Sequence, residues 1–424
     1  MKIAVLRFVV VALVCASVVV VGSSLRAQHA SANEDKFAPL YSALGMPQPA
    51  QTPATAAAEQ TIAQEGREKN VKLLGDMPVS QFIPVMNYFA SSLGRRCNFC
   101  HAVKNGQIDY ASDDKPEKNT AREMIKLVLE TNKNFFKGNT DVSCYVCHRG
   151  RNNPQSVPPL PLPTPVPPPA GAGGPGAGGP GGAGQQPGGA QPQGSPTPRP
   201  TPTPADEILA KYVTALGGQA AIDKIRSRTA TGTITTANGQ SGTYELIQTG
   251  DKAVETITTP RGAIKLVLTS ATNGWESNGP NSREMAAGDI ARARNAYQLF
   301  SFLKLKDQYT RLRSGGRDRV GDRDAYVVLA NRSDTELERL YFDVETGLLL
   351  RRISYLRTMV GIIPQQWDFE DYRDVDGVKM PFTIRLSTVD AGNVFSVRKF
   401  TEIKLNGTVD DSKFVRPPAA TPNP

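Results

Sequence analysis

The segment from residue 154 to residue 204 sets the strongest limit on how this chain can fold. It holds 18 Pro and 12 Gly in 51 residues, no acidic side chain, and Arg199 as its one basic side chain. This composition cannot bury an apolar core, and it alternates stiff polyproline stretches with flexible Gly stretches. We therefore expect a Pro/Gly-rich disordered linker with separately folded parts on either side, and a length of 424 residues leaves room for two or three domains.

The first 30 residues predict export. Two basic residues precede the apolar run FVVVALVCASVVVVG, and small residues follow it, which is the pattern of a signal peptide. The 18 residues between Arg7 and Arg26 could also remain as an uncleaved anchor. The predicted location is the periplasm, with attachment to the inner membrane if this segment stays. Residues 31–65 are rich in Ala, Gln, Thr and Pro and are predicted to form a flexible tether.

One pentapeptide, present twice, uses four of the five cysteines and two of the three histidines. Residues 97–101 read CNFCH and residues 144–148 read CYVCH. C-x-x-C-H is the attachment signature of c-type haem, in which both thiols add to the haem vinyl groups and the His becomes the proximal iron ligand. A pooled zinc site would have to explain both histidines, and a redox dithiol explains neither. We predict two covalently bound haem c groups, one held by Cys97, Cys100 and His101 and the other by Cys144, Cys147 and His148.

Methionine is the predicted sixth ligand of each iron. The third histidine, His29, lies next to the predicted cleavage region, so ligation by two histidines is essentially excluded, and Met/His is the other common closed arrangement. Apolar residues at helical spacing place Met86 on one stripe of a helix before Cys97. Met77 lies outside that stripe and is the weaker alternative.

The helix ends can also be predicted. Ser80 is expected to cap the first helix and Gly94 to end it. Thr120 and Glu123 are expected to form a capping box for a second helix. Met124 begins the apolar stripe of that helix and is the predicted second methionine ligand. The other members of the stripe are Leu127, Val128, Thr131 and Phe135.

Between about residues 66 and 153 three stretches follow one another along the chain: MPVSQFIPVMNYFASSLGRRCNFCH, DDKPEKNTAREMIKLVLETN and CYVCHRG. This region resembles the cytochrome c subunit of photosynthetic reaction centres, in which a helix, a turn and C-x-x-C-H carry each haem. The resemblance implies that Met86 serves the haem of His101 and that Met124 serves the haem of His148. That subunit usually has four such units, whereas this chain has two.

Residues 205–420 predict a different kind of domain. A helical opening is followed by short β-rich runs separated by turn signals, and helical periodicity returns between Asp289 and Leu305. We expect a curved, half-barrel-like antiparallel sheet with covering helices. The stretches GGQAAIDKIRSRTATGTI and DYRDVDGVKMPFTIR are similar to periplasmic lipoprotein-carrier-like domains, which implies an apolar ligand. Trp275 and Trp367 would either line its cavity or be ordinary core residues.

The sequence thus predicts a multidomain α + β protein: a small helical dihaem domain (66–153), the linker and the β-rich domain. Its predicted function is that of a periplasmic dihaem cytochrome, an electron-transfer protein and not an enzyme, because six filled positions leave no iron open to substrate. One alternative is a dihaem peroxidase-like oxidoreductase, for which the chain has no spare distal histidine. Another is a periplasmic carrier of apolar ligands or lipoproteins with accessory haems.

The net positive charge of residues 66–153 indicates which kinds of binding partner to expect. Residues 66–153 carry 14 basic and 9 acidic side chains, and the exported chain has no Lys/Arg run. Redox proteins with acidic docking surfaces, or a membrane complex, are therefore the predicted partners, and nucleic acid is not expected.

Overall fold

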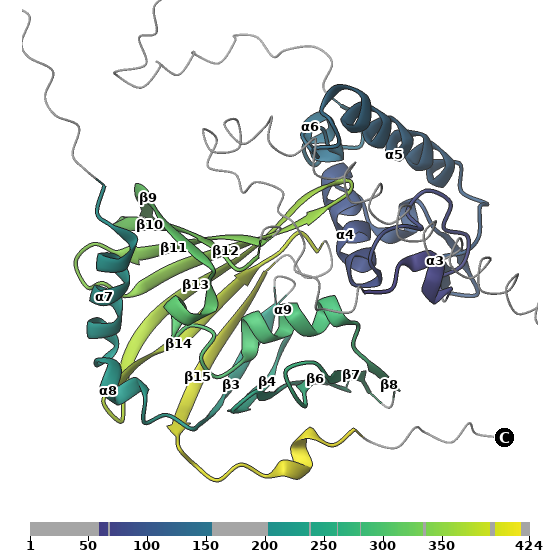
Figure 1. Ribbon diagram of the computed structural model, residues 1–424. Helices are drawn as coiled ribbons and strands as arrows, with labels where there is room; N and C mark the ends of the chain where they lie inside the picture. Colours follow the sequence, from purple (N-terminus) through teal and green to yellow (C-terminus); the bar gives the residue numbers. More distant parts are fainter. Residues whose placement is uncertain are drawn as a thin grey trace, which may run out of the picture.

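The computed structural model describes residues 59–66, 68–154, 202–236, 239–260, 262–279, 281–333, 336–390 and 395–416. A small helical part (residues 59–154) lies against a large β-rich part (residues 202–416), as Figure 1 shows. This confirms the predicted multidomain α + β fold class. The predicted signal or anchor segment and nearly all of the predicted linker lie outside the described residues. Among the helices that are described, none combines the length and the apolar character needed to span a membrane.

The helical part contains two long helices, and each precedes a C-x-x-C-H pentapeptide, as predicted. In chain order its elements are α3 (Ile62–Glu65), the 3-10 turn η1 (Val79–Gln81), α4 (Phe82–Leu93), the 3-10 turn η2 (Cys97–Phe99), β1 (Ala102–Lys104), β2 (Gln107–Asp109), α5 (Pro116–Phe135) and α6 (Cys144–His148).

The predicted start of α4 is wrong, whereas its predicted end is confirmed. Ser80 does not cap the helix, because its backbone N–H and its hydroxyl both donate to the Glu59 carboxylate, at 2.8 and 2.9 Å. Gly94 ends α4 in the left-handed conformation, with φ of 62°.

The predicted capping box of α5 is also wrong. α5 begins at Pro116, and a proline is well suited to a first helical position because its missing N–H would have no helical partner there. Thr120 consequently lies in the second turn, where its hydroxyl donates to the Pro116 carbonyl at 3.3 Å.

The β-rich part is built on one antiparallel sheet of thirteen strands. Its helical elements are α7 (Ala205–Leu216), α8 (Gln219–Ile222), α9 (Ala287–Tyr297), η3 (Leu305–Gln308) and η4 (Asp411–Phe414). Its strands are β3 (Ser227–Thr236), β4 (Ser241–Thr249), β5 (Lys252–Thr259), β6 (Gly262–Leu268), β7 (Gly274–Asn278), β8 (Asn281–Glu284), β9 (Arg311–Val320), β10 (Arg323–Asn331), β11 (Glu336–Asp343), β12 (Leu349–Thr358), β13 (Gly361–Val375), β14 (Val378–Ser387) and β15 (Phe395–Leu405).

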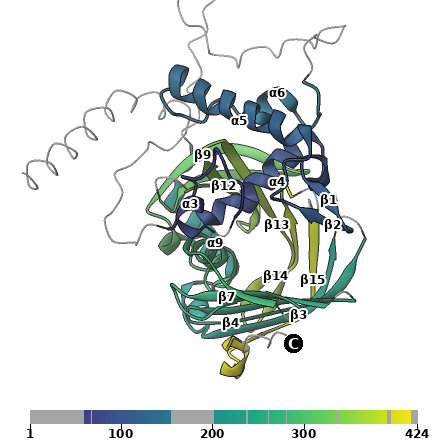
Figure 2. The ribbon, with the colours of Figure 1, turned by 90° about the vertical axis from the view of Figure 1, so that its right-hand side faces the viewer.

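The sheet is an open, curved half-barrel. Its order is β8-β7-β6-β5-β4-β3-β15-β14-β13-β12-β11-β10-β9, so two runs of sequential hairpins join where β3 pairs with β15. Figure 2 shows the strong curvature of the sheet, with α9 inside the curve. This confirms the predicted half-barrel-like sheet with covering helices.

Both tryptophans are core residues. Trp367 belongs to the main core and meets the Tyr297 ring edge-on, with ring centroids 6.1 Å apart. Trp275 belongs to a separate cluster, and its indole N–H donates to the Phe414 carbonyl at 3.1 Å. A cavity of about 430 Å³ lies between α7 and residues 303–307, and neither tryptophan lines it. The core interpretation of the two tryptophans therefore holds.

The helical part packs on the β12–β13 hairpin and on α9. Val85 and Tyr88 of α4 share one buried cluster with Val360 and Ile363 of the hairpin region. The Arg292 guanidinium of α9 donates to the Ser80 carbonyl at 2.7 Å. Ile62 of α3, in the segment predicted to be a tether, also belongs to this cluster and is 2% exposed. Figures 1 and 2 both show α4 beside the β12–β13 hairpin.

Candidate functional site

The ends of the two motif-bearing units meet at a glycine pair. After α4 the chain reverses at Gly94 into Cys97, and a Cβ atom at Gly94 would lie 2.2 Å from the Gly150 carbonyl oxygen. The Gly150 N–H, just after the second pentapeptide, donates to the Ser92 carbonyl at 2.8 Å. Only glycine suits position 94, because its φ is positive and a backbone carbonyl lies against it.

All four thiols are free, as covalent attachment of a haem requires. Cys97 and Cys147 are exposed, while Cys100 and Cys144 are half-buried. Burial raises the pKa of Cys144 to about 11. The pKa of Cys100 is also raised, by burial and then by the nearby Glu117 carboxylate. Among the described residues, no group of three or more His, Cys, Asp or Glu side chains is arranged so that it could hold a metal ion.

The two histidines of the pentapeptides differ in their surroundings. His148 Nδ1 lies 3.1 Å from the Arg151 carbonyl oxygen. An N–H donated to that carbonyl leaves the lone pair of the other ring nitrogen available to a metal. Burial lowers the pKa of His101, and the positive charge of Lys118 lowers it further. A neutral imidazole is the form that binds iron.

The predicted methionine ligands occupy different surroundings. Met86 is half-buried on α4, at the edge of the cluster that joins the two parts. Met124, on α5, is 41% exposed. Met77, the weaker alternative, is 1% exposed inside the same cluster as Val85.

α5 has one buried face and one exposed apolar face. Ile125, Val128 and Asn132 are buried, so Val128 is the one member of the predicted stripe that is buried. The exposed face carries Leu127 at 56% and Phe135 at 78%, together with Met124. Tyr145 and Val146, inside the second pentapeptide, are also exposed, at 54% and 48%. Apolar surface of this kind fits a covering haem.

The second motif is positioned by neutral hydrogen bonds. The Asn132 amide donates to the Val142 carbonyl at 2.7 Å and accepts from the Val142 N–H at 2.9 Å. The Tyr88 hydroxyl bonds to the Ser143 hydroxyl at 2.8 Å, next to Cys144. The sequence patterns predicted neither contact. A polar side chain four residues after Val128, on the buried face, was the signal that could have identified Asn132.

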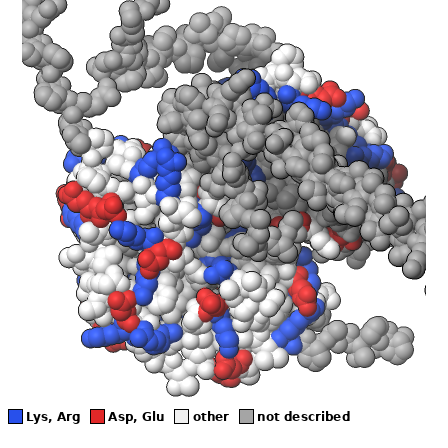
Figure 3. Space-filling model, in the orientation of Figure 1, with Lys and Arg blue, Asp and Glu red and all other residues white. Residues whose placement is uncertain are grey.

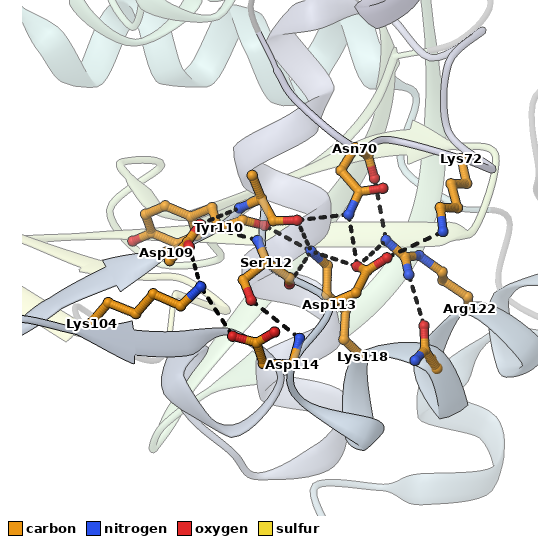
Figure 4. Close-up of polar contacts among 12 residues, drawn as sticks. Asn70, Lys72, Lys104, Asp109, Tyr110, Ser112, Asp113, Asp114, Lys118 and Arg122 are labelled. Atoms are coloured by element: carbon orange, nitrogen blue, oxygen red, sulfur yellow. Dashed lines mark hydrogen bonds and ion pairs between the residues drawn. The ribbon is translucent and has the colours of Figure 1, made fainter.

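The first motif is positioned by charge. Asp113, in the loop that joins the β1–β2 hairpin to α5, accepts from Arg122 at 2.8 Å, Lys72 at 3.2 Å and Asn70 at 2.7 Å (Figure 4). The Arg122 guanidinium and these neighbours hold the pKa of the Asp113 carboxyl well below its usual range. Tyr110, in the same loop, meets the His101 ring edge-on, with ring centroids 5.1 Å apart.

Comparison with known proteins confirms the resemblance seen in the motifs. Residues 21–159 match the family model described as photosynthetic reaction centre cytochrome C subunit. Cytochrome c-554 of Chloroflexus aurantiacus is 32% identical over 120 residues, which are 24% of this chain and 28% of that protein. The photosynthetic reaction center cytochrome c subunit of Thermochromatium tepidum is 34% identical over 91 residues, 20% of this chain and 22% of that subunit. The chain therefore spans under a third of the length of either relative.

Two solved structures that are similar to part of this chain belong to a different group of proteins from these cytochromes. A LolA superfamily protein from Nitrosomonas europaea covers 50% of this chain and 98% of its own length, at 15% identity and a TM-score of 0.35. A putative outer membrane lipoprotein-sorting protein domain from Vibrio parahaemolyticus covers 50% of this chain and 94% of its own, at 12% identity and a TM-score of 0.34.

Proposed function

We propose that this chain is a dihaem c-type cytochrome that carries single electrons. The observation that carries the proposal is the pairing, found twice, of a C-x-x-C-H pentapeptide with free thiols and a preceding helix that bears a methionine. Both pairs fall inside the segment that matches the reaction centre cytochrome family.

Each unit supplies a complete set of ligands. Cys97 and Cys100 would form the thioether bonds of the first haem, with His101 and Met86 as its axial ligands. In the second unit the thioethers come from Cys144 and Cys147 and the axial ligands from His148 and Met124. Haem supplies one-electron iron chemistry when bound. Thioether bonds prevent its loss, and the carbonyl bonded to His148 orients that ring and raises its basicity.

Filled axial positions favour a carrier over an enzyme. A peroxidase-like site needs an iron with an open distal position and a nearby acid–base group, usually a histidine. The sequence has three histidines; two belong to the pentapeptides, and His29 lies 57 residues before Met86, the first of the proposed ligands. As the proposed sixth ligands, Met86 and Met124 would occupy the position that such an acid–base group needs.

The proposed location is the periplasm, with or without an inner-membrane anchor, and the proposed partners are redox proteins or a membrane complex. The surplus of basic side chains in residues 66–153 supports partners with acidic docking surfaces. On the face visible in Figure 3, basic and acidic side chains are interspersed.

An absorption spectrum tests the proposal. Protein made with a haem-maturation system should show, when oxidised, the weak far-red sulfur-to-iron band of Met/His ligation. Met86→Ala and Met124→Ala should each remove about half of that band. Met359→Ala is the matched control, because Met359 is also half-buried beside the cluster between the two parts, and it should leave the band unchanged. Absence of the band, or ready binding of carbon monoxide by the wild type, would contradict two closed Met/His sites.

A further inference from the structure

Lys118 is a buried lysine that holds one loop. It is 9% exposed, and its ammonium donates to the carbonyls of Tyr110 at 2.8 Å, Ala111 at 3.2 Å and Ser112 at 2.8 Å (Figure 4). It also lies 3.3 Å from Asp113 Oδ1. Lysine is almost never buried without partners for its charge, and here the partners are three consecutive carbonyls and the next carboxylate.

The cluster around this loop carries surplus positive charge. Lys72, Lys118 and Arg122 surround Asp113, which is the one carboxylate that all three contact. Around Lys104 negative charge is in surplus, because its one ammonium pairs with two carboxylates, Asp109 at 3.2 Å and Asp114 at 3.0 Å. Lys104 and its two carboxylate partners are more exposed than Lys118, so solvent and salt screen their charges more strongly.

The loop that Lys118 holds contacts His101, the proposed proximal ligand of the first haem. The loop carries Tyr110, whose ring packs edge-on against His101. The Lys118 ammonium donates to the main-chain carbonyl of this same Tyr110, so its charge lies one residue away from the His101 ring.

We propose that Lys118 is a positioning residue for the first haem: it fixes the loop that packs on His101, and its buried charge selectively raises the reduction potential of that haem. This inference rests on the function proposed above. Reduction removes one positive charge from the iron, so a fixed cation nearby stabilises the reduced state. Burial keeps this interaction from being screened.

Redox titration of the haem-loaded protein, followed by absorption, tests the inference. Lys118→Met should lower the potential of one haem and leave the other unchanged, whereas Lys118→Arg should restore most of the wild-type value. Lys126→Met is the matched control, because Lys126 also lies on α5 but its side chain is 56% exposed; it should move neither potential. The affected haem should be the one whose sulfur-to-iron band Met86→Ala removes.

Asp113→Asn separates electrostatics from simple loosening of the loop. Removal of a negative charge should raise the potential of the same haem, the opposite sign to Lys118→Met, whereas loosening alone would move both variants in one direction. Arg122→Gln, which removes a second cation of the cluster, should lower that potential even if Lys118→Met does not accumulate. Equal shifts of both haem potentials, or no shift in Lys118→Met and Asp113→Asn, would overturn the inference. The proposed function would still stand in that case if the protein holds two haems that both show the sulfur-to-iron band. A wild type without haem would instead overturn the proposed function.

Discussion

The two C-x-x-C-H units differ more in structure than in sequence. The first is held by ions: Lys118, Arg122 and Asp113 fix the loop beside His101. The second is held by neutral groups, the Asn132 amide and the Tyr88 hydroxyl. A repeated pentapeptide therefore does not imply a repeated environment, and the two haems should respond differently to charge, acid and mutation.

The largest expected effect comes from the place where the two units meet. Gly94→Val should cost about 3–5 kcal/mol of unfolding free energy, because a side chain there meets the Gly150 carbonyl as well as an unfavourable φ. Urea unfolding of the haem-loaded protein measures it. Gly106→Val is the matched control, with φ of 75° and open space around its Cβ position, and it should cost about 1–2 kcal/mol. Equal costs for the two variants would mean that the units do not touch.

Loss of the neutral support should affect the second unit alone. Asn132→Leu leaves both main-chain groups of Val142 without their partner and should cost about 2–3 kcal/mol. Hydrogen exchange should accelerate at Val142 and in the residues up to His148, while the loop around Tyr110 keeps its protection. Equal acceleration around both motifs would contradict separate supports.

A smaller effect is expected at Tyr88, which links the second motif to the β-rich part. Tyr88→Phe removes the bond to Ser143 but keeps the ring beside Gly361, so the expected loss is about 1 kcal/mol. The far-red band of the haem of His148 should change and that of His101 should not. If only the band of His101 responds, the assignment of Tyr88 to the second unit is wrong.

Acid should weaken the first unit before the second. The pKa of Asp113 is lower in the folded protein than its ordinary value of 3.8, so its contribution to stability is present above that value and is lost as the pH falls below it. The protection factors of the amide hydrogens around Tyr110, which correct for the intrinsic pH dependence of exchange, should therefore fall progressively as the pH is lowered below 3.8. Asp113→Asn should remove most of this pH dependence, and an unchanged acid response in that variant would contradict the assignment.

Local signals were sufficient to predict much of the helical part. The C-x-x-C-H spacing, the two helices and the left-handed Gly94 follow from chemistry within a few residues. The alternation and turn signals beyond residue 205 similarly predicted a curved antiparallel sheet. Each of these features depends on neighbours that are close in the chain.

The failed predictions depended on distant partners or on competing local signals. Ser80 bonds to Glu59, 21 residues earlier, and so does not cap α4. Pro116 starts α5 one turn before the Thr120 position that resembled a cap. The roles of Tyr88 and Asn132 arise only when α4 and α5 pack against the segment before Cys144, and no spacing rule contains that information.

The most direct test of the account is the mass of the intact protein, made with a haem-maturation system and measured after denaturation. We predict the mass of the chain plus two haems, and plus one haem when Cys97 and Cys100 are both replaced by Ser. A mass without haem, or haem released by denaturation, would contradict the central claim that the two pentapeptides each hold a covalently attached haem.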